Sequence, residues 1–124
     1  MSCVVARTFS IDEARALLPD VVARADQVIA VRADLIELSG DLASGTPSAL
    51  GGRAEAKALE ARLDDLLSWF RAQGIEVKGW APLLLDFPGE VDGEPALLCW
   101  LEGDVELEWY HRPEHGFAGR RRLP

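Results

Sequence analysis

The chain has 124 residues, a length that suits one domain with a small core. Its formal net charge of −8 argues against broad binding to nucleic acid or to an anionic membrane, because both need a basic face. No uncharged stretch approaches the roughly 20 apolar residues that a membrane span needs, so no membrane segment is expected.

The first predicted element is a long helix that begins after Ser10. Ser10 and Glu13 have the spacing of a capping box, in which each side chain accepts a hydrogen bond from the backbone N–H of the other. Pro19 removes one backbone donor inside the helix, so we expect a kink near Leu18. Apolar residues at helical spacing predict a buried stripe: Ala14, Leu18, Val21, Ala25, Val28 and Leu35. A second set widens it toward another neighbour: Leu17, Val22, Ile29 and Ile36.

A flexible loop over residues 40–52 is the next expectation, since GDLASGTPSALGG has four glycines, a proline and no periodicity. A second helix follows from about Arg53 to Gln73, and Gly74 is placed to end it. Its apolar residues repeat in steps of three and four, as in a coiled coil: Ala56, Leu59, Leu63, Leu66 and Phe70. The two helices and their connection, residues 10–74, predict an antiparallel hairpin.

From residue 75 the periodicity changes to that of strands. Extended segments are expected at 75–78, at Leu83–Leu85 and at 96–101, with a tight turn at Asp92–Gly93. After a second turn at 102–104, the sequence VELEWY alternates cleanly and predicts a strand with Val105, Leu107 and Trp109 on one face. The resulting meander covers about 75–110 and leaves residues 111–124 as a C-terminal tail.

The predicted fold class is therefore α+β, with a long helical hairpin, its first helix kinked, packed against a small antiparallel sheet in a single domain over 1–124. The two-sided apolar stripe of the first helix and the coiled-coil-like seam of the second predict a homodimer, since a small core gains stability by association.

Three stretches resemble the small prokaryotic domain-of-unknown-function family 2203 (DUF2203): TFSIDEARALLP, LLLDFPGEVDGEPALLCW, and WYH followed by GFAGR. The resemblance covers nearly the whole chain except the loop at 40–52, and it implies a compact bacterial domain with helices first and strands after. It supplies no activity and no catalytic residues. His115 departs from the family pattern, which puts any mechanism that needs both histidines in doubt. The matching positions are Asp86, Phe87, Pro88, Trp100, His111, Gly116, Phe117, Gly119 and Arg120.

His111 and His115, the only histidines of the chain, are candidate ligands of a divalent metal, with Glu114 as a third. Pro113 between the two histidines disfavours a continuous helix that would place both on one face. The alternative is that His111 ends a strand and His115 is an exposed loop residue.

An anion site is a second candidate in GFAGRRR. Gly116 and Gly119 can bend the backbone so that N–H groups converge on an anion, and Arg120 can contact a phosphate or carboxylate. His111 is a further donor. The alternative is a turn in which Phe117 pins the tail to the core and the arginines are solvated. From Arg112 onward four arginines face one glutamate, a local charge of +3, so an acidic partner or a second copy is expected rather than nucleic acid.

Asp86 follows an apolar strand and is either a ligand or general base, or an acceptor for the N–H groups of a turn. Cys99 lies in an apolar strand and is expected to be buried and inert. Cys3 lies near the N-terminus, which lacks the apolar region of a signal peptide. Two cysteines do not make a disulfide framework, so we expect a reduced, cytoplasmic protein.

Two functional hypotheses follow. The first is a non-enzymatic interaction or ligand-binding module that self-associates. The alternative is a small metal- or anion-binding enzyme, with a site between the sheet and the GFAGR loop that uses Asp86, His111 and Arg120. Arg120, Arg121 and Arg122 also suit a salt-sensitive contact made by the tail.

Overall fold

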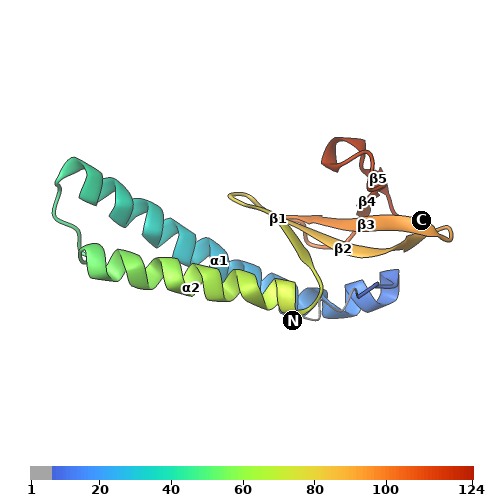
Figure 1. The fold of residues 1–124 in the computed structure, drawn as a ribbon, viewed down its shortest axis with the longest axis horizontal. Helices are drawn as coiled ribbons and strands as arrows, with labels where there is room; N and C mark the ends of the chain where they lie inside the picture. The colour runs from blue at the N-terminus through green and yellow to red at the C-terminus, as the bar shows by residue number, and fades with distance from the viewer. Residues whose placement is uncertain (1–6) are drawn as a thin grey trace, which may run out of the picture. The chain divides into compact units, whose positions relative to one another are not determined.

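The computed structural model describes residues 7–124, so Cys3 lies outside the described residues. It confirms the α+β class, with two helices followed by a five-stranded sheet (Figure 1). The elements are α1 (Ile11–Ser44), α2 (Arg53–Ala72), β1 (Glu76–Trp80), β2 (Leu83–Val91), β3 (Glu94–Leu101), β4 (Trp109–His111), the 3-10 helix η1 (Phe117–Gly119) and β5 (Arg121–Arg122). No helix within residues 7–124 is long and apolar enough to cross a membrane.

The chain divides into two compact units. One unit holds the chain up to Val21 together with Phe70–Pro124, and it contains the whole sheet. The other is Val22–Trp69, which comprises most of α1 and α2 and the loop between them. The long helix α1 therefore contributes its first turns to the sheet unit and the rest to the hairpin unit.

The capping box at the start of α1 is confirmed. The Ser10 N–H donates to Glu13 Oε1 at 2.9 Å, and the Glu13 N–H donates to Ser10 Oγ at 3.0 Å. The bond from Ser10 holds the pKa of the Glu13 carboxyl below its usual range. The helix continues through Pro19, where the kink stays a prediction, and it extends to Ser44. The connection to α2 is therefore shorter than the expected loop over residues 40–52.

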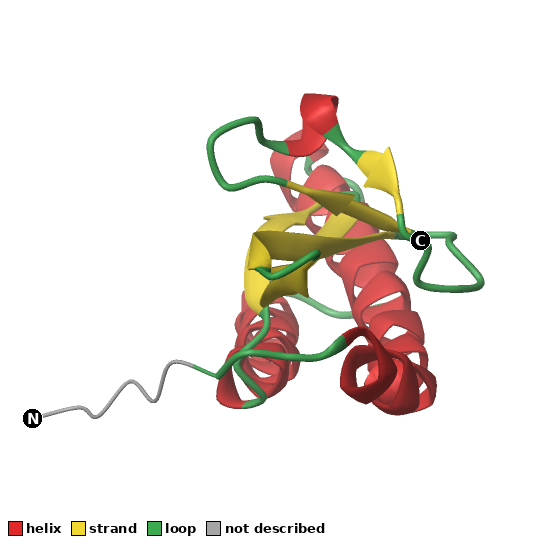
Figure 2. Ribbon diagram, turned by 90° about the vertical axis from the view of Figure 1, so that its right-hand side faces the viewer, coloured by secondary structure: helices red, strands yellow, loops and turns green. Residues whose placement is uncertain are grey.

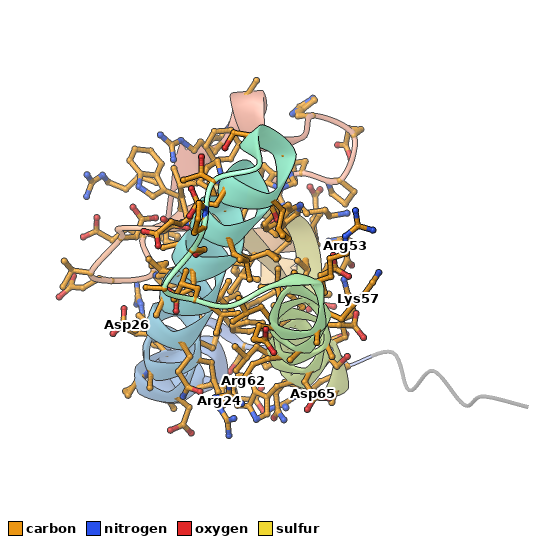
Figure 3. All side chains as sticks on the ribbon, turned by 90° about the vertical axis from the view of Figure 1, so that its left-hand side faces the viewer. Arg24, Asp26, Arg53, Lys57, Arg62 and Asp65 are labelled. Atoms are coloured by element: carbon orange, nitrogen blue, oxygen red, sulfur yellow. The ribbon has the colours of Figure 1, made fainter. Side chains whose placement is uncertain are left out.

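The hairpin unit is held together by an apolar seam between α1 and α2. The members of this seam are buried: Ala25, Val28, Leu38, Ala56, Leu63 and Leu66. At its rim, Arg62 donates to Gln27 Oε1 at 3.2 Å and the Arg24 guanidinium lies over the Trp69 ring. Charged residues such as Asp26, Lys57 and Asp65 lie on the outside of the two helices (Figure 3).

The sheet is an antiparallel meander in the order β1-β2-β3-β4-β5 (Figure 2). The predicted turn at Asp92–Gly93 joins β2 and β3. Both residues have positive φ, 55° and 77°, which is the requirement of a two-residue type I′ turn. Gly74, at φ 87°, ends α2 as expected.

The expected strand over VELEWY is wrong for residues 105–108, because pairing begins only at Trp109. Leu107 is buried, and its carbonyl accepts two hydrogen bonds from the Arg15 guanidinium at 3.3 and 3.2 Å. The Leu107 carbonyl is therefore used by Arg15 and not by a neighbouring strand, and Val105 is 86% exposed.

The predicted tail also differs from the structure, since β4 reaches His111 and β5 adds a fifth strand. Leu123 beyond β5 is buried, and the Leu123 N–H donates to the Glu108 carbonyl at 2.7 Å. Phe117, which was expected to pin the tail, is 37% exposed.

The two faces of the sheet differ because side chains alternate along each strand. We call the face of Phe87, Leu98 and Tyr110, which are cross-strand partners, the inner face. It is buried throughout its centre, and the Phe9 ring meets the Phe87 ring edge-on at 5.3 Å. The opposite side is the outer face, and it carries the polar groups described next.

Candidate functional site

A row of chemically active side chains crosses the outer face of the sheet. Residues paired across neighbouring antiparallel strands point to the same side, so the register places in one row Glu76, Asp86, Cys99, Trp109 and Arg122. The row takes one residue from each of the five strands. It therefore joins groups that lie up to 46 residues apart in the sequence, the separation of Glu76 from Arg122.

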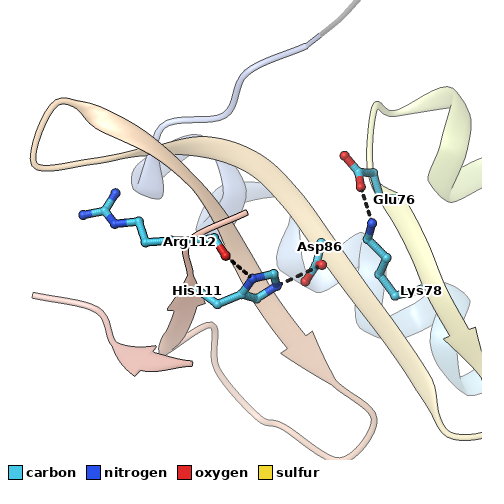
Figure 4. A network of polar contacts seen from close by, with 5 residues as sticks. All are labelled: Glu76, Lys78, Asp86, His111 and Arg112. Atoms are coloured by element: carbon cyan, nitrogen blue, oxygen red, sulfur yellow. Dashed lines mark hydrogen bonds and ion pairs between the residues drawn. The ribbon is translucent and has the colours of Figure 1, made fainter. Parts of the chain in front are cut away.

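Asp86 and His111 meet within this face, although β3 lies between their strands. The His111 Nε2 atom lies 3.1 Å from Asp86 Oδ2, and His111 Nδ1 lies 3.0 Å from the backbone carbonyl oxygen of Arg112 (Figure 4). Asp86 is 2% exposed and His111 4% exposed. The pair thus ties β2 to β4 over the intervening strand, in a place that water does not reach.

The two contacts of His111 constrain its protons. Both neighbours of the ring, a carbonyl oxygen and a carboxyl group, accept hydrogen bonds, and a neutral imidazole has only one N–H. Two arrangements satisfy both contacts: an imidazolium beside the Asp86 carboxylate, or a neutral ring whose Nε2 accepts from a protonated Asp86. In either arrangement the pair is electrically neutral, which suits its burial.

The surroundings of Asp86 differ between its two oxygens. Oδ2 contacts His111, whereas Oδ1 is buried and has no hydrogen-bond partner among residues 7–124. Burial raises the pKa of Asp86, and the His111, Cys99 and Lys78 groups act in the opposite direction. Lys78 itself pairs with Glu76 at 2.8 Å, a contact that raises the pKa of Lys78 (Figure 4).

Folding stability should depend on pH through Asp86. Because the pKa of Asp86 is raised in the folded state, the folded protein holds this proton at pH values where the unfolded chain, with a pKa of about 3.9, has lost it. The contribution of Asp86 to stability therefore falls as pH rises through the folded-state pKa. We expect the free energy of unfolding of the wild type, minus that of Asp86→Asn, to increase as pH is lowered through the folded-state pKa of Asp86 toward the unfolded value. Urea unfolding at each pH measures it, and a difference that does not change with pH contradicts it.

Cys99 is the free cysteine of the described residues and is buried. Burial, and then the neighbouring Asp86 carboxylate, raise the pKa of the Cys99 thiol to about 12. The thiol therefore stays protonated at physiological pH, which makes it a poor nucleophile. This agrees with the inert role that its apolar strand predicts.

Arg120 lies between two aromatic rings at the end of the row. Its guanidinium carbon is 4.8 Å from the centre of the Trp109 ring and 4.5 Å from that of Phe117, and the Arg122 guanidinium carbon is 5.0 Å from the Trp109 ring. Arg122 also pairs with Glu108 at 3.6 Å. Within residues 7–124, no carboxylate pairs with Arg120. We call these four residues, Trp109, Phe117, Arg120 and Arg122, the arginine–aromatic face.

Gly116 and Gly119 form a turn rather than an open cradle. The Gly119 N–H donates to the Gly116 carbonyl and the Arg120 N–H donates to the Phe117 carbonyl, both at 3.1 Å. These two amides are thus used within η1 and do not point at a common anion. A Cβ on Gly119 would collide with the His115 side chain, so this glycine allows the loop to close.

The proposed metal ligands are not brought together. His115 and Glu114 are exposed loop residues, whereas His111 is buried with Asp86. Among the described residues, no group of three or more histidine, cysteine, aspartate or glutamate side chains has a metal-binding arrangement.

Arg112 is a residue whose role the sequence did not reveal. Its Nη1 donates to the carbonyls of Val91, Glu94 and Pro95 at 3.1, 3.1 and 3.2 Å, so it fastens the tip of the β2–β3 hairpin. Its own carbonyl faces His111. The local charge of +3 in the last residues predicted an anion site, but Arg112, one of the arginines that contribute to this charge, stabilises the hairpin instead.

The sequence matches the model of a family described as "Uncharacterized conserved protein (DUF2203)" over residues 7–123. No curated protein and no solved structure matches the chain.

Proposed function

Because the chain belongs to the uncharacterised family DUF2203, whose description names no activity, we propose its function from its own side chains. We propose that it is a non-enzymatic binding module that holds an anionic group on the arginine–aromatic face and that self-associates. The observation that carries the proposal is the guanidinium of Arg120, held between two rings and paired with no carboxylate of the described chain.

The chemistry of this arrangement favours a carboxylate or phosphate ligand. Stacking on Trp109 and Phe117 fixes the plane of the Arg120 guanidinium, and a planar group presents parallel N–H donors along its edge to an anion. Fixing the side chain in advance also lowers the entropy cost of binding. Arg122, on the same indole, adds a second positive charge.

An enzyme remains the alternative, with Asp86, His111 and Arg120 as its residues. The structure favours the binding module, because a general base must reach the proton that it abstracts. Asp86 and His111 are 2% and 4% exposed, and they bond to each other. We propose a bacterial, cytoplasmic setting, in keeping with a chain that has two cysteines, of which Cys99 is free.

Inorganic phosphate and succinate are suitable first probes for the anion site. In an NMR titration, the Nε–Hε signal of Arg120 should shift and saturate, and Arg120→Gln should weaken binding at least about tenfold, since a charged hydrogen bond contributes about 1.5–3 kcal/mol. Whichever probe binds more tightly identifies the anion class.

Arg53→Gln is the matched control, because it removes the same charge from an exposed position of the hairpin unit. The proposal is wrong if the two variants lose affinity equally, or if neither anion moves the Arg120 signal at low ionic strength.

Self-association is supported by large apolar side chains that lie in water. Ile36 and Leu42 of α1 are exposed, as are Val105 and Phe117 of the sheet unit. An apolar side chain with a charged side chain beside it can form a contact that removes the first from water and pairs the second. Val105 and Phe117 differ from Ile36 and Leu42 because their charged neighbours complement each other. Val105 lies beside acidic side chains, whereas Phe117 lies beside the Arg120 guanidinium.

A further inference from the structure

We propose that two copies of this chain dock reciprocally, with the acidic loop of each copy, residues 102–108, on the arginine–aromatic face of the other. This inference rests on the self-association proposed above and names the surfaces that make it. The occupant of the face is thus a carboxylate-bearing segment of a second copy.

The acidic loop presents one apolar and one acidic side chain to solvent. Its ends are anchored: Asp104 Oδ2 accepts the Leu101 N–H at 3.0 Å, Leu107 is buried, and Glu108 pairs with Arg122. Between these anchors Val105 is 86% exposed, and the exposed side chain of Glu106 makes no hydrogen bond or ion pair within residues 7–124. The loop therefore holds a valine and a free carboxylate in a fixed place.

The arginine–aromatic face presents the complementary pattern. Phe117 is 37% exposed beside the Arg120 guanidinium, which has no carboxylate partner in the described chain. The face thus has an apolar ring with a positive charge beside it, and the acidic loop has an apolar Val105 with the negative Glu106 beside it, so the two surfaces are complementary. Contact would remove both Val105 and Phe117 from water and give Glu106 a guanidinium partner.

A second copy fits better than an unrelated acidic partner because both surfaces belong to the same compact unit. In a two-fold dimer each surface then occurs twice, and every contact made by one copy is made again by the other. The net charge of −8 on each chain opposes association, so the attraction has to be local. The dimer should be weak and salt-sensitive, and its association constant should fall about tenfold between about 50 and about 500 mM NaCl.

A charge exchange tests the pairing directly by analytical ultracentrifugation. Glu106→Arg makes both contacts of a homodimer repulsive, and Arg120→Glu does the same from the other side. Each variant alone should associate at least about tenfold more weakly than the wild type. An equimolar mixture of the two variants should form a heterodimer. In one of its contacts the changed loop of the first variant meets the changed face of the second, so the charges are again opposite. The other contact joins the unchanged loop of the second variant to the unchanged face of the first, as in the wild type.

Glu37→Arg is the matched control, since it makes the same charge change at an exposed position of α1 and should at most strengthen association slightly. A mixture that stays as monomeric as its two components overturns the inference, and so does equal dimerisation of both single variants. Circular dichroism of each variant excludes unfolding as the cause. If the wild type is monomeric at every concentration, self-association fails as well, while the phosphate and succinate titration of Arg120 still decides the anion site.

Discussion

Replacing His111 by alanine is expected to lower the free energy of unfolding by about 3–5 kcal/mol, the usual cost of removing one partner of a buried, hydrogen-bonded pair of titratable groups. The variant leaves the Asp86 carboxyl, of which Oδ1 is already without a partner, in a site that is 2% exposed. It also removes a side-chain link between β2 and β4, and it leaves the Arg112 carbonyl without its contact to the His111 ring. Urea unfolding followed by circular dichroism at neutral pH measures the loss.

The companion variants separate charge from volume. Asp86→Asn keeps a hydrogen bond, because its amide N–H donates to His111 Nε2 while Nδ1–H donates to the Arg112 carbonyl, so its cost should be about 1 kcal/mol. Adding Asp86→Asn to His111→Ala should recover part of the loss, because the buried group left without its partner is then an amide, which cannot ionise. If the double variant is as unstable as the sum of the two single ones, the cavity and not the charge explains the effect of His111→Ala.

Replacing Gly89 by alanine is expected to cost about 2–3 kcal/mol, near the upper end for forcing an extra methyl group into a closed site. The Phe9 N–H donates to the Pro88 carbonyl at 2.7 Å, and Phe9 pairs with Gly89 in a parallel bridge. A Cβ on Gly89 would overlap the backbone carbonyl oxygen of Phe9, which cannot turn aside as a flexible side chain can. Relief of this overlap would pull Phe9 away from the Phe87 ring.

Gly40→Ala is the matched control and should change stability in the opposite direction. Gly40 lies inside α1, has no atom within 4 Å of an added Cβ, and does not have a positive φ. Alanine at an exposed helix position should therefore stabilise the protein by about 0.5–1 kcal/mol. Thermal unfolding of both variants measures the contrast. A Gly89→Ala protein as stable as Gly40→Ala would show that close contact of the Phe9 backbone with Gly89 of β2 is not needed for stability.

The features that the sequence predicted correctly are those that neighbouring residues decide. Ser10 and Glu13 are three positions apart, and one turn of helix is enough to bring them together. Asp92–Gly93 makes its turn because both residues tolerate positive φ. The seam of α2 follows from a 3.6-residue period, and the burial of Cys99 from its apolar strand.

The strand boundaries needed more than the local pattern. VELEWY alternates as a strand should, yet Arg15, 92 residues away from Leu107, takes the Leu107 carbonyl, and residues 105–108 lie outside the sheet. In the same way, the charge of the last residues suggested a tail, but Arg121 and Arg122 pair with β4 as a strand. Whether such a segment pairs as a strand depends on hydrogen-bond partners that are distant in sequence. The periodicity of the segment itself does not reveal these partners.

The sequence by itself thus determined the α+β class, the start of α1, both ends of α2, the tight turn and the list of candidate polar residues. Only the tertiary structure decided how those residues combine. His111 reaches over β3 to Asp86 rather than to His115, and Arg120 lies between Trp109 and Phe117 rather than in a glycine cradle. The reason is that the register of five strands sets which side chains share a row, and a shift of one residue would turn each of them to the opposite face.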